Sequence, residues 1–370
     1  MRLGIQVLPF IFSFVSSQVI SSPQPEPFTD FTNYIIWNPA ADALPDESLV
    51  ITWENYPLEP PLVNHPIYRS VDGGSTWTNY SAVEDQVNDW GMRFQPNLYT
   101  LPEDFGGYAA GSILAAGVST PFSLEGGVYI DLYVSEDKAA TWTFVSHIVY
   151  GDGPETIQNG NDALWEPWLM LYNGQLVCFF SDQRDPAHSQ KLVHVTSTDL
   201  QTWSDPVPDA VNSIQADRPG MTTIAHIEST DSYIMTYELC GAASCAVHYK
   251  VASSPLEFDS APAIQLISND TNPIQPRGSP YVVWTEHPDR TDGSGLIIAS
   301  SASAEVVFVN EDAADPAGWK SVDVGMWSAY SRGMRIVTLQ EKKKLFFTNG
   351  GNMGNPAYNS IACGVVEIPR

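Results

Sequence analysis

Short apolar runs recur along almost the whole chain in one repeating order, and this repeat constrains the fold more than any other feature of the sequence. In the clearest unit, residues 168–172 and 175–180 flank Asn173-Gly174, a pair typical of a two-residue β-hairpin turn. A third apolar run follows at 192–197, and then a polar turn. Alternating apolar residues over such short runs predict half-buried strands, and no segment has the period of an amphipathic helix.

The same unit recurs at a spacing that suits the blades of a β-propeller. Its first strands are expected near five residues separated by 71, 53, 60 and 53 positions: Asn97, Trp168, Met221, Tyr281 and Met334. Repeated antiparallel units of this length are typical of propellers. A further unit precedes Asn97, with strands expected at 49–53 and 67–70.

The last unit, with strands expected at 334–340, 344–348 and 361–368, is one strand short. We expect residues 28–34 to supply the missing strand and close the ring. The sequence therefore predicts an all-β protein, a single six-bladed β-propeller of four-stranded antiparallel blades over residues 23–370, closed by an N-terminal strand.

The turn after the third strand carries a signature. Residues 70–77 fit the pattern S-x-D-x-G-x-T-W known as the Asp-box, and 135–142 and 197–203 are degenerate copies. In such a turn Asp accepts backbone N–H bonds, Gly permits a positive φ, and Trp packs between sheets. We therefore expect Asp72 and Asp137 to be structural residues.

Composition excludes several classes of function. The 43 acidic against 17 basic residues give a net charge of −26, which repels phosphate backbones and anionic lipid. We therefore expect no nucleic-acid or membrane partner, and a monomer. A chain that is 43% hydrophobic, with 16 Tyr, 15 Phe and 11 Trp, does not resemble a disordered acidic segment.

The first residues have the pattern of an export signal. Arg2 precedes the apolar run 3–15, and small residues follow before Pro23, so residues 1–22 are predicted to be a signal peptide. We expect a secreted, extracellular protein. Sequons at Asn79 and Asn269 predict glycosylation in that compartment.

The cysteines are Cys178, Cys240, Cys245 and Cys363, too few for a disulfide scaffold in a chain of this length. Cys240 and Cys245 are close enough in sequence to close a tight loop; the alternative is four buried free thiols. No CxxC pair accompanies a histidine cluster, so we expect no metal site and no cofactor.

Antiparallel connectivity sorts polar residues onto two faces of the ring. We call the end at which each first strand begins the top face; second strands end there and third strands begin there. Polar residues at these positions are the functional candidates: His65, Arg93, Glu166, Asp182, Arg184, Arg218, Glu238, Arg277, Tyr330 and Arg332.

Two glutamates stand out among these candidates. Glu166 lies between Trp165 and Trp168 and before a proline, which we expect to hold it extended. Glu238 ends a strand of the next blade at the same mouth. Glycosidic cleavage requires two carboxyl groups, one to protonate the leaving oxygen and one to attack carbon or activate water. We expect the two indoles to stack on sugar rings. For a lone glutamate at a strand end, the alternative is a solvated or arginine-paired side chain.

Seven segments together resemble glycoside hydrolase family 93, fungal secreted exo-α-L-arabinanases on a six-bladed propeller. They are 68–77, 165–168, 181–184, 190–199, 218–221, 233–238 and 280–284. The resemblance runs from about Tyr34 to the C-terminus. It implies release of arabinobiose from the non-reducing end of linear α-1,5-L-arabinan, with retention of configuration.

The resemblance also implies roles for individual residues. Glu166 matches the family's nucleophile and Glu238 its general acid/base. Retention predicts carboxyl groups about 5 to 5.5 Å apart, against about 6.5 to 9.5 Å for inversion. A phenol beside the nucleophile orients it or stabilises positive charge, and Tyr330 is the candidate; the alternative is a packed tyrosine.

The remaining candidates have weaker assignments. Arginines bind substrate hydroxyls or keep the glutamates ionised, or else form structural ion pairs: Arg93, Arg184, Arg218, Arg277 and Arg332. Asp182 pairs with Arg184 or positions the acid/base. His65 is a substrate contact or a loop residue.

The insert 240–245 matches no motif of the family. We predict a Cys240–Cys245 bridge that stiffens the loop beside Glu238 and shapes a subsite. We expect no bridge between Cys178 and Cys363, which fall on opposite sides of the ring.

Two rival functions use the same fold. A sialidase needs an arginine triad whose first member lies in an R-I-P motif, which residues 64–69 lack. A non-catalytic sugar-binding propeller repeats its binding residues in every blade, whereas Glu166 and Glu238 occupy non-equivalent positions in two blades.

Overall fold

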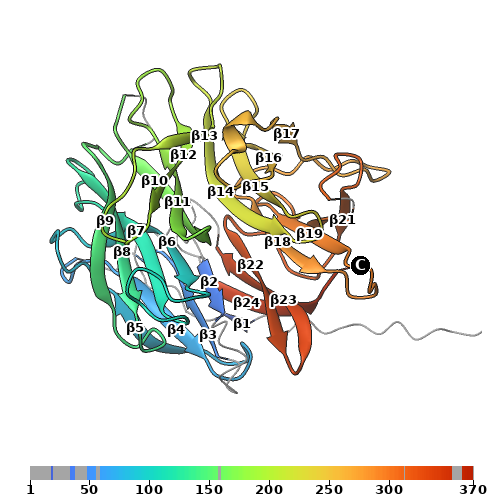
Figure 1. Ribbon diagram of the computed structural model, residues 1–370, viewed down its shortest axis with the longest axis horizontal. Helices are drawn as coiled ribbons and strands as arrows, with labels where there is room; N and C mark the ends of the chain where they lie inside the picture. The colour runs from blue at the N-terminus through green and yellow to red at the C-terminus, as the bar shows by residue number, and fades with distance from the viewer. Residues whose placement is uncertain are drawn as a thin grey trace, which may run out of the picture.

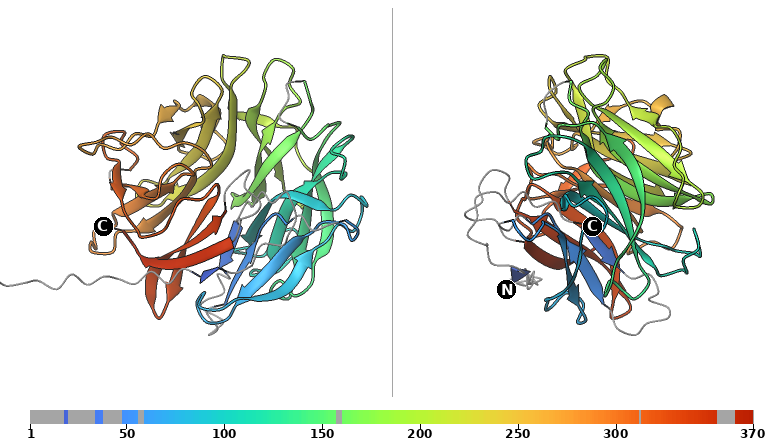
Figure 2. Two further views of the ribbon diagram at one scale, coloured as in Figure 1. Left: turned by 180° about the vertical axis from the view of Figure 1, so that it is seen from behind. Right: turned by 90° about the vertical axis from the view of Figure 1, so that its left-hand side faces the viewer.

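The computed structural model describes residues 18–19, 34–37, 48–55, 59–156, 160–311, 313–351 and 361–369. These residues form six four-stranded antiparallel sheets around a central axis (Figure 1). The same ring of sheets is visible from behind (Figure 2). No described helix is long and apolar enough to cross a membrane. The predicted six-bladed, four-stranded propeller is confirmed.

In the first five blades the strands follow chain order from the axis outward, whereas the outermost strand of the sixth blade comes from the N-terminal end of the chain. Blade 1 contains β2 (Tyr34–Trp37), β3 (Leu49–Thr52), β4 (His65–Ser70) and β5 (Thr78–Val83). Blade 2 contains β6 (Met92–Thr100), β7 (Ile113–Ser119), β8 (Val128–Ser135) and β9 (Thr143–Gly151). Blade 3 contains β10 (Leu164–Tyr172), β11 (Gln175–Asp182), β12 (Lys191–Ser197) and β13 (Val207–Ala210).

The second half of the ring follows the same plan. Blade 4 contains β14 (Arg218–Ile227), β15 (Ser232–Cys240), β16 (Ala246–Ala252) and β17 (Ile264–Gln265). Blade 5 contains β18 (Tyr281–Glu286), β19 (Gly295–Ser300), β20 (Val307–Asn310) and β21 (Lys320–Val322). Blade 6 contains β22 (Arg332–Leu339), β23 (Lys342–Gly350), β24 (Ile361–Glu367) and β1 (Gln18–Val19). The short 3-10 helix η2 (Phe258–Ser260) precedes β17.

An N-terminal strand closes the ring, but not the one that we expected. β1 pairs with the free edge of β24, with Gln18 opposite Cys363. The predicted closing segment 28–34 is wrong, because Tyr34 begins β2, which pairs with β3 as the first strand of blade 1. Residues 28–33 lie outside the described residues, as does the predicted signal peptide apart from β1.

The Asp-box turns are tied by their own side chains. Asp72 accepts the Thr76 N–H at 2.8 Å and the Thr76 hydroxyl at 2.7 Å. Asp137 binds Thr141 in the same way. The indole N–H of Trp142 donates to Ser81 of the preceding blade at 3.2 Å. These aspartates therefore hold turns, and the tryptophans join neighbouring blades.

The apolar core lies between adjacent blades, and the first strands surround a central cavity. This cavity has a volume of about 140 Å³. Its walls come from five blades: Asn97, Leu98, Tyr99, Trp168, Leu169, Met170, Ile224, Tyr281 and Arg335. Trp168 is buried here, edge-on to the Tyr281 ring at 5.3 Å, so it belongs to the core and not to the mouth where we expected it to stack on sugar.

Candidate active site

Glu166 lies at a bulge in the first strand of blade 3. The pairing of β10 with β11 shifts between Trp165 and Trp168, and Glu166 has a φ of 59°. The prediction that the following proline holds Glu166 extended is wrong, because the residue adopts the left-handed region. A non-glycine residue rarely does so, and such strain clusters at functional sites.

A residue with positive φ also occurs at the top face in three other blades. Gln95, Met221 and Ser279 have φ values of 42°, 54° and 36° at the starts of the first strands of blades 2, 4 and 5. Each N–H of these four residues meets a side chain of the preceding blade. Four strained residues in consecutive blades therefore surround one mouth.

The carboxylate of Glu166 is held by three neighbours. Its Oε2 accepts the Ser181 hydroxyl at 2.7 Å and the Met221 N–H at 2.6 Å. Burial raises its pKa above the ordinary carboxyl value, whereas these two bonds and the charge of Arg218 act in the opposite direction. A Cβ at Gly220 would lie 3.3 Å from this oxygen, so the glycine leaves room for the carboxylate.

Glu238 has a different environment. Its Oε2 accepts the Ser279 N–H at 2.8 Å, and its Oε1 lies 3.3 Å from the sulfur of Cys240. Burial and then the charge of Glu166 raise the pKa of Glu238 to about 7. The Ser279 N–H and Arg218 oppose this rise. Glu238 is therefore the better proton donor near neutral pH.

The structure brings the two predicted glutamates to one mouth. Met221 donates its N–H to Glu166 and Ser279 donates its N–H to Glu238. These two donors lie side by side, because the Ser279 hydroxyl reaches the Met221 sulfur at 3.0 Å. Arg218 acts electrostatically on both carboxylates and hydrogen-bonds Gln183 and Gln190. The arginine is thus a fixed cation beside the pair.

Tyr330 lies at the same mouth. Its hydroxyl lies 3.7 Å from the Met221 sulfur, and its N–H donates to Gly351. Met221 also donates its N–H to Glu166. Tyr330 therefore borders Met221, the neighbour of Glu166, and its role in orienting Glu166 stays a prediction.

Trp165 is the tryptophan nearest the pair. It is half-buried, and its ring packs against Phe94 of blade 2 at 5.8 Å. Its indole nitrogen has no hydrogen-bond partner. That nitrogen is buried, so it is closed to a sugar, and stacking of the Trp165 ring on a sugar stays a prediction.

The predicted arginines divide into two groups. Arg184 forms a two-point ion pair with Asp182, at 2.8 and 2.9 Å. Of the two roles considered for Asp182, the structure shows the pairing with Arg184. Arg277 is exposed and donates to the Ser244 carbonyl at 3.1 Å. Arg184, Arg218 and Arg277 thus lie at or near the mouth.

Three other candidates are buried against protein groups and do not face the mouth as substrate contacts. Arg332 is 1% exposed, and its guanidinium donates to four carbonyls of blade 5 and the following loop. Arg93 pairs with Glu59 at 2.9 Å. His65 starts β4, and burial lowers its pKa to about 3, which keeps the imidazole neutral. Their partners are protein groups, which sequence position alone does not reveal.

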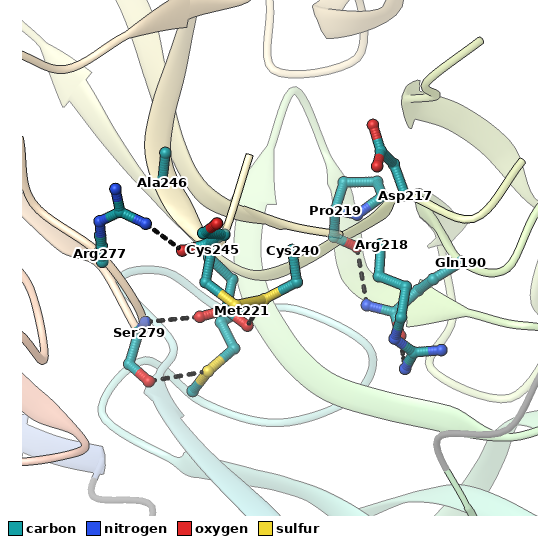
Figure 3. The surroundings of a disulfide bond; sticks show 12 residues. Gln190, Asp217, Arg218, Pro219, Met221, Cys240, Cys245, Ala246, Arg277 and Ser279 are labelled. Carbon is teal, nitrogen blue, oxygen red and sulfur yellow. Dashed lines mark hydrogen bonds between the residues drawn. A yellow bond between two sulfur atoms is a disulfide. The ribbon is translucent and has the colours of Figure 1, made fainter. Parts of the chain in front are cut away.

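The predicted disulfide is present between Cys240 and Cys245, while Cys178 and Cys363 are free and buried. Figure 3 shows Arg277 directed toward the bridge on one side, with Arg218 and Gln190 on the other. In the described part of the chain, the one group of three potential metal ligands is Glu238 with these two sulfurs. Because the sulfurs are bonded to each other, they are not thiolate ligands.

Sequence reasoning missed two residues of the mouth. Gln95 accepts the Glu166 N–H at 3.4 Å, and its own N–H donates to the buried Glu54 at 2.7 Å. Gln95-Pro96 repeats the pattern of Glu166-Pro167 in the next blade, a signal that was available. Glu54 follows a second strand, but β2 was not recognised as the first.

The glycosylation candidates are both at the surface. Asn79 is exposed on β5, and Asn269 is exposed with its amide donating to the Ala317 carbonyl at 3.0 Å. Modification of either residue stays a prediction.

Two glutamates in unlike environments, one of them on strained backbone, lie in the mouth of a six-bladed ring, an arrangement typical of a propeller-fold glycoside hydrolase. No protein-family model matches the chain, and no curated protein matches it. Among solved structures, it is 36% identical to the glycoside hydrolase family 93 α-L-arabinofuranosidase of Fusarium graminearum in complex with arabinobiose, covering 95% of this chain and 98% of that one with a TM-score of 0.86. It is 33% identical to the Penicillium chrysogenum α-L-arabinanase complexed with arabinobiose, covering 95% and 97% with a TM-score of 0.86.

The chain belongs to glycoside hydrolase family 93. The NanB sialidase of Streptococcus pneumoniae, at 10% identity and a TM-score of 0.55, covers 93% of this chain and shares the fold alone.

Proposed function

We propose that this protein is a secreted exo-arabinanase that releases arabinobiose from the non-reducing end of linear α-1,5-L-arabinan by retaining double displacement. The observation that carries the proposal is the pair of glutamates in unlike environments at one mouth. Two relatives are complexed with arabinobiose, which supports an arabino-oligosaccharide as substrate. The proposed export signal, residues 1–22, includes β1, so its removal would leave β22, β23 and β24 as the described strands of blade 6.

The environments support a proposed role for each carboxyl group. Glu166 accepts two hydrogen bonds at one oxygen beside Arg218, and this arrangement favours the ionised nucleophile. Glu238, with its pKa raised to about 7, holds a proton for the leaving oxygen at weakly acidic pH.

The reaction then has two steps. Glu166 attacks the anomeric carbon while Glu238 gives its proton to the glycosidic oxygen, and the shortened chain leaves. Glu238, now ionised, removes a proton from water, which attacks the glycosyl–Glu166 ester and frees the disaccharide. The Met221 and Ser181 donors re-form their bonds to the released carboxylate. We expect the carboxyl groups to be about 5 to 5.5 Å apart in this mechanism.

The test is product analysis on debranched linear arabinan, with the anomer of the first product read by NMR. We expect arabinobiose of the same configuration as the bond that is cut. Glu166→Ala and Glu238→Ala should each lose activity by a factor of at least about 100. Glu228→Ala, an exposed glutamate away from the mouth, is the matched control and should be unchanged.

Other outcomes would redirect the assignment. Inverted product would contradict double displacement, and products of mixed length would contradict the exo mode. Full turnover in both glutamate variants would remove the pair from the chemistry. If the wild-type protein cleaves no arabinan, release of sialic acid would favour a sialidase, and sugar binding without cleavage would favour a lectin.

A further inference from the structure

A cluster of aromatic rings lies on blade 2, apart from the catalytic pair. The ring of Tyr129 stacks on Trp90 at 5.7 Å and contacts Tyr150 at 4.8 Å. A Cβ at Gly127 would lie 2.7 Å from the Tyr150 ring and 3.2 Å from that of Trp90. The glycine therefore lets the rings close over the backbone. We call Trp90, Tyr129 and Tyr150, together with Phe122, the blade 2 platform.

The platform exposes large apolar rings to water. Phe122 is 74% exposed and Tyr150 44%. The Phe122 ring lies 5.7 Å from the Arg93 guanidinium, which also approaches the Trp90 carbonyl at 3.5 Å. Single exposed rings are ordinary, whereas a contiguous set with a polar rim marks a binding surface.

Neighbouring side chains hold the rings in place. The exposed His147 stacks on Tyr129 at 4.1 Å, and its Nδ1 bonds the fully buried Asp131 at 2.7 Å. Asn88 donates to the other oxygen of Asp131 at 2.7 Å. The Trp90 N–H donates to Asp85 at 2.7 Å. A surface held in this way loses little side-chain entropy when it binds.

The platform lies on the same face as the glutamates. β8 begins at Val128, beside Tyr129, and β9 ends at Gly151, beside Tyr150. Because the strands are antiparallel, these ends lie at the top face with the start of β10. A bonded path also joins the two places: Arg184 donates to the Tyr150 carbonyl at 2.9 Å and pairs with Asp182. Asp182 follows Ser181, which holds Glu166.

We propose that the blade 2 platform is a distal binding site for the arabinan chain, outside the sugars at the bond that is cut. This inference rests on the proposed function. Aromatic faces stack on the C–H faces of sugar rings, while Arg184 and Asp152, which faces the Tyr150 hydroxyl, bind hydroxyl groups. A net charge of −26 disfavours an anionic lipid or nucleic acid at these rings. A neutral sugar chain fits both properties.

The test compares a long substrate with a short one. Tyr150→Ala and Phe122→Ala should raise the KM for linear arabinan by about fivefold, which is the effect of one lost ring contact. Hydrolysis of arabinotriose should stay within about twofold of wild type, because a distal site of this kind would bind only longer chains. Tyr80→Ala, an exposed tyrosine on the outer strand of blade 1 that is also covered by an arginine, is the matched control.

A binding measurement separates this inference from the catalytic one. In native gels that contain linear arabinan, the inactive Glu166→Ala protein should be retarded, and Glu166→Ala/Tyr150→Ala should migrate faster. If wild type cleaves arabinan and both platform variants keep its KM for polymer, the platform is refuted while the proposed function stands. Equal losses on polymer and trimer would also refute a distal role. A wild-type protein that neither cleaves nor binds arabinan overturns both proposals.

Discussion

At the scale of single residues, the two glutamates differ because their partners differ. Glu166 accepts a hydroxyl and a backbone N–H at one oxygen, whereas Glu238 accepts one N–H and faces a disulfide sulfur with its other oxygen. Fewer donors leave burial less opposed, so the pKa of Glu238 rises to about 7. Such a difference in pKa supports Glu238 as the proposed acid and Glu166 as the proposed nucleophile.

This difference predicts the pH dependence of activity. The acid must be protonated, so kcat/KM should fall as pH rises through about 7, the pKa of Glu238. It should also fall toward acid pH as Glu166 gains a proton. Glu238→Gln should lower kcat by about 10² to 10⁴ and abolish the alkaline limb of the profile. An unchanged alkaline limb in the variant would assign that limb to another group.

Glu54 allows a test of a structural carboxylate at the same mouth. It is buried and accepts the N–H of the strained Gln95 at 2.7 Å. Glu54→Ala should lower the free energy of unfolding by about 1 to 3 kcal/mol, because that buried N–H loses its acceptor. Glu54→Gln keeps an acceptor oxygen and should lose less, as measured by urea denaturation. An equal loss of unfolding free energy in the two variants would show that the charge of Glu54, and not its hydrogen bond, stabilises the protein.

The sequence predicted that Glu166 and Glu238 lie at one mouth but did not predict the rest of their surroundings, for physical reasons. Glu166 and Glu238 belong to local motifs at strand ends, which a repeat can locate. Whether Arg332 faces solvent or the carbonyls of blade 5 depends on packing between blades, which no local pattern encodes. Glu54 was missed because only the strands 49–53 and 67–70 were expected in its blade, so its place directly after a second strand was not recognised.

At the scale of elements, the site is built from bulges in first strands. Gln95, Glu166 and Ser279 each precede a proline and have positive φ. The strand pattern located these segments. A residue before proline usually adopts extended backbone, and this preference predicted the wrong conformation for Glu166. Contacts from the neighbouring blade stabilise the strained form, so the bulge is a tertiary feature.

The disulfide loop after β15 gives a further prediction. The bridge joins Cys240 to Cys245, two residues beyond Glu238 and in contact with its Oε1. Cys240→Ser/Cys245→Ser should lower the free energy of unfolding by about 2 kcal/mol, from the entropy of a short closed loop. It should also lower kcat, since the loop no longer fixes Glu238, the proposed acid/base.

Reductant supplies the control for the disulfide prediction. Treatment of wild type with a thiol reductant should reproduce the kcat of the double variant, and the same treatment should leave the double variant unchanged. A double variant with wild-type kcat and pH profile would show that the bridge does not position Glu238.

At the scale of the whole molecule, the fold class and the number of blades were predictable, because the same strand pattern, weak in any one blade, occurs several times along the chain. The closing strand was not, because β1 has only two residues and so shows no alternation. Residues 34–37 carry an apolar strand pattern, but pairing with β3 rather than β24 is decided by the geometry of the closed ring.

Buried carboxyl groups predict how the stability of the whole propeller depends on pH. Burial raises the pKa of Glu238 to about 7 and of Asp209 to about 6, the latter despite His194 and Lys250 beside it, and raises that of Glu155 well above its usual value. Unfolded carboxyl groups titrate near about 4. Between about pH 4 and 7 the native state therefore holds more protons than the unfolded state, so stability falls as pH rises.

We expect the Tm at pH 8 to be lower than at pH 5 by about 5 °C or more. Repulsion within a net charge of −26 acts in the same direction, but salt screens it, whereas buried carboxyl groups are screened much less. Most of the difference should therefore survive in 0.5 M NaCl, a concentration at which the screening length is on the order of 4 Å. Glu155→Gln, which removes one buried titration, should make the difference smaller. A Tm that rises between pH 5 and 8 would contradict the linkage, and one that loses its pH dependence in salt would assign the effect to surface charge.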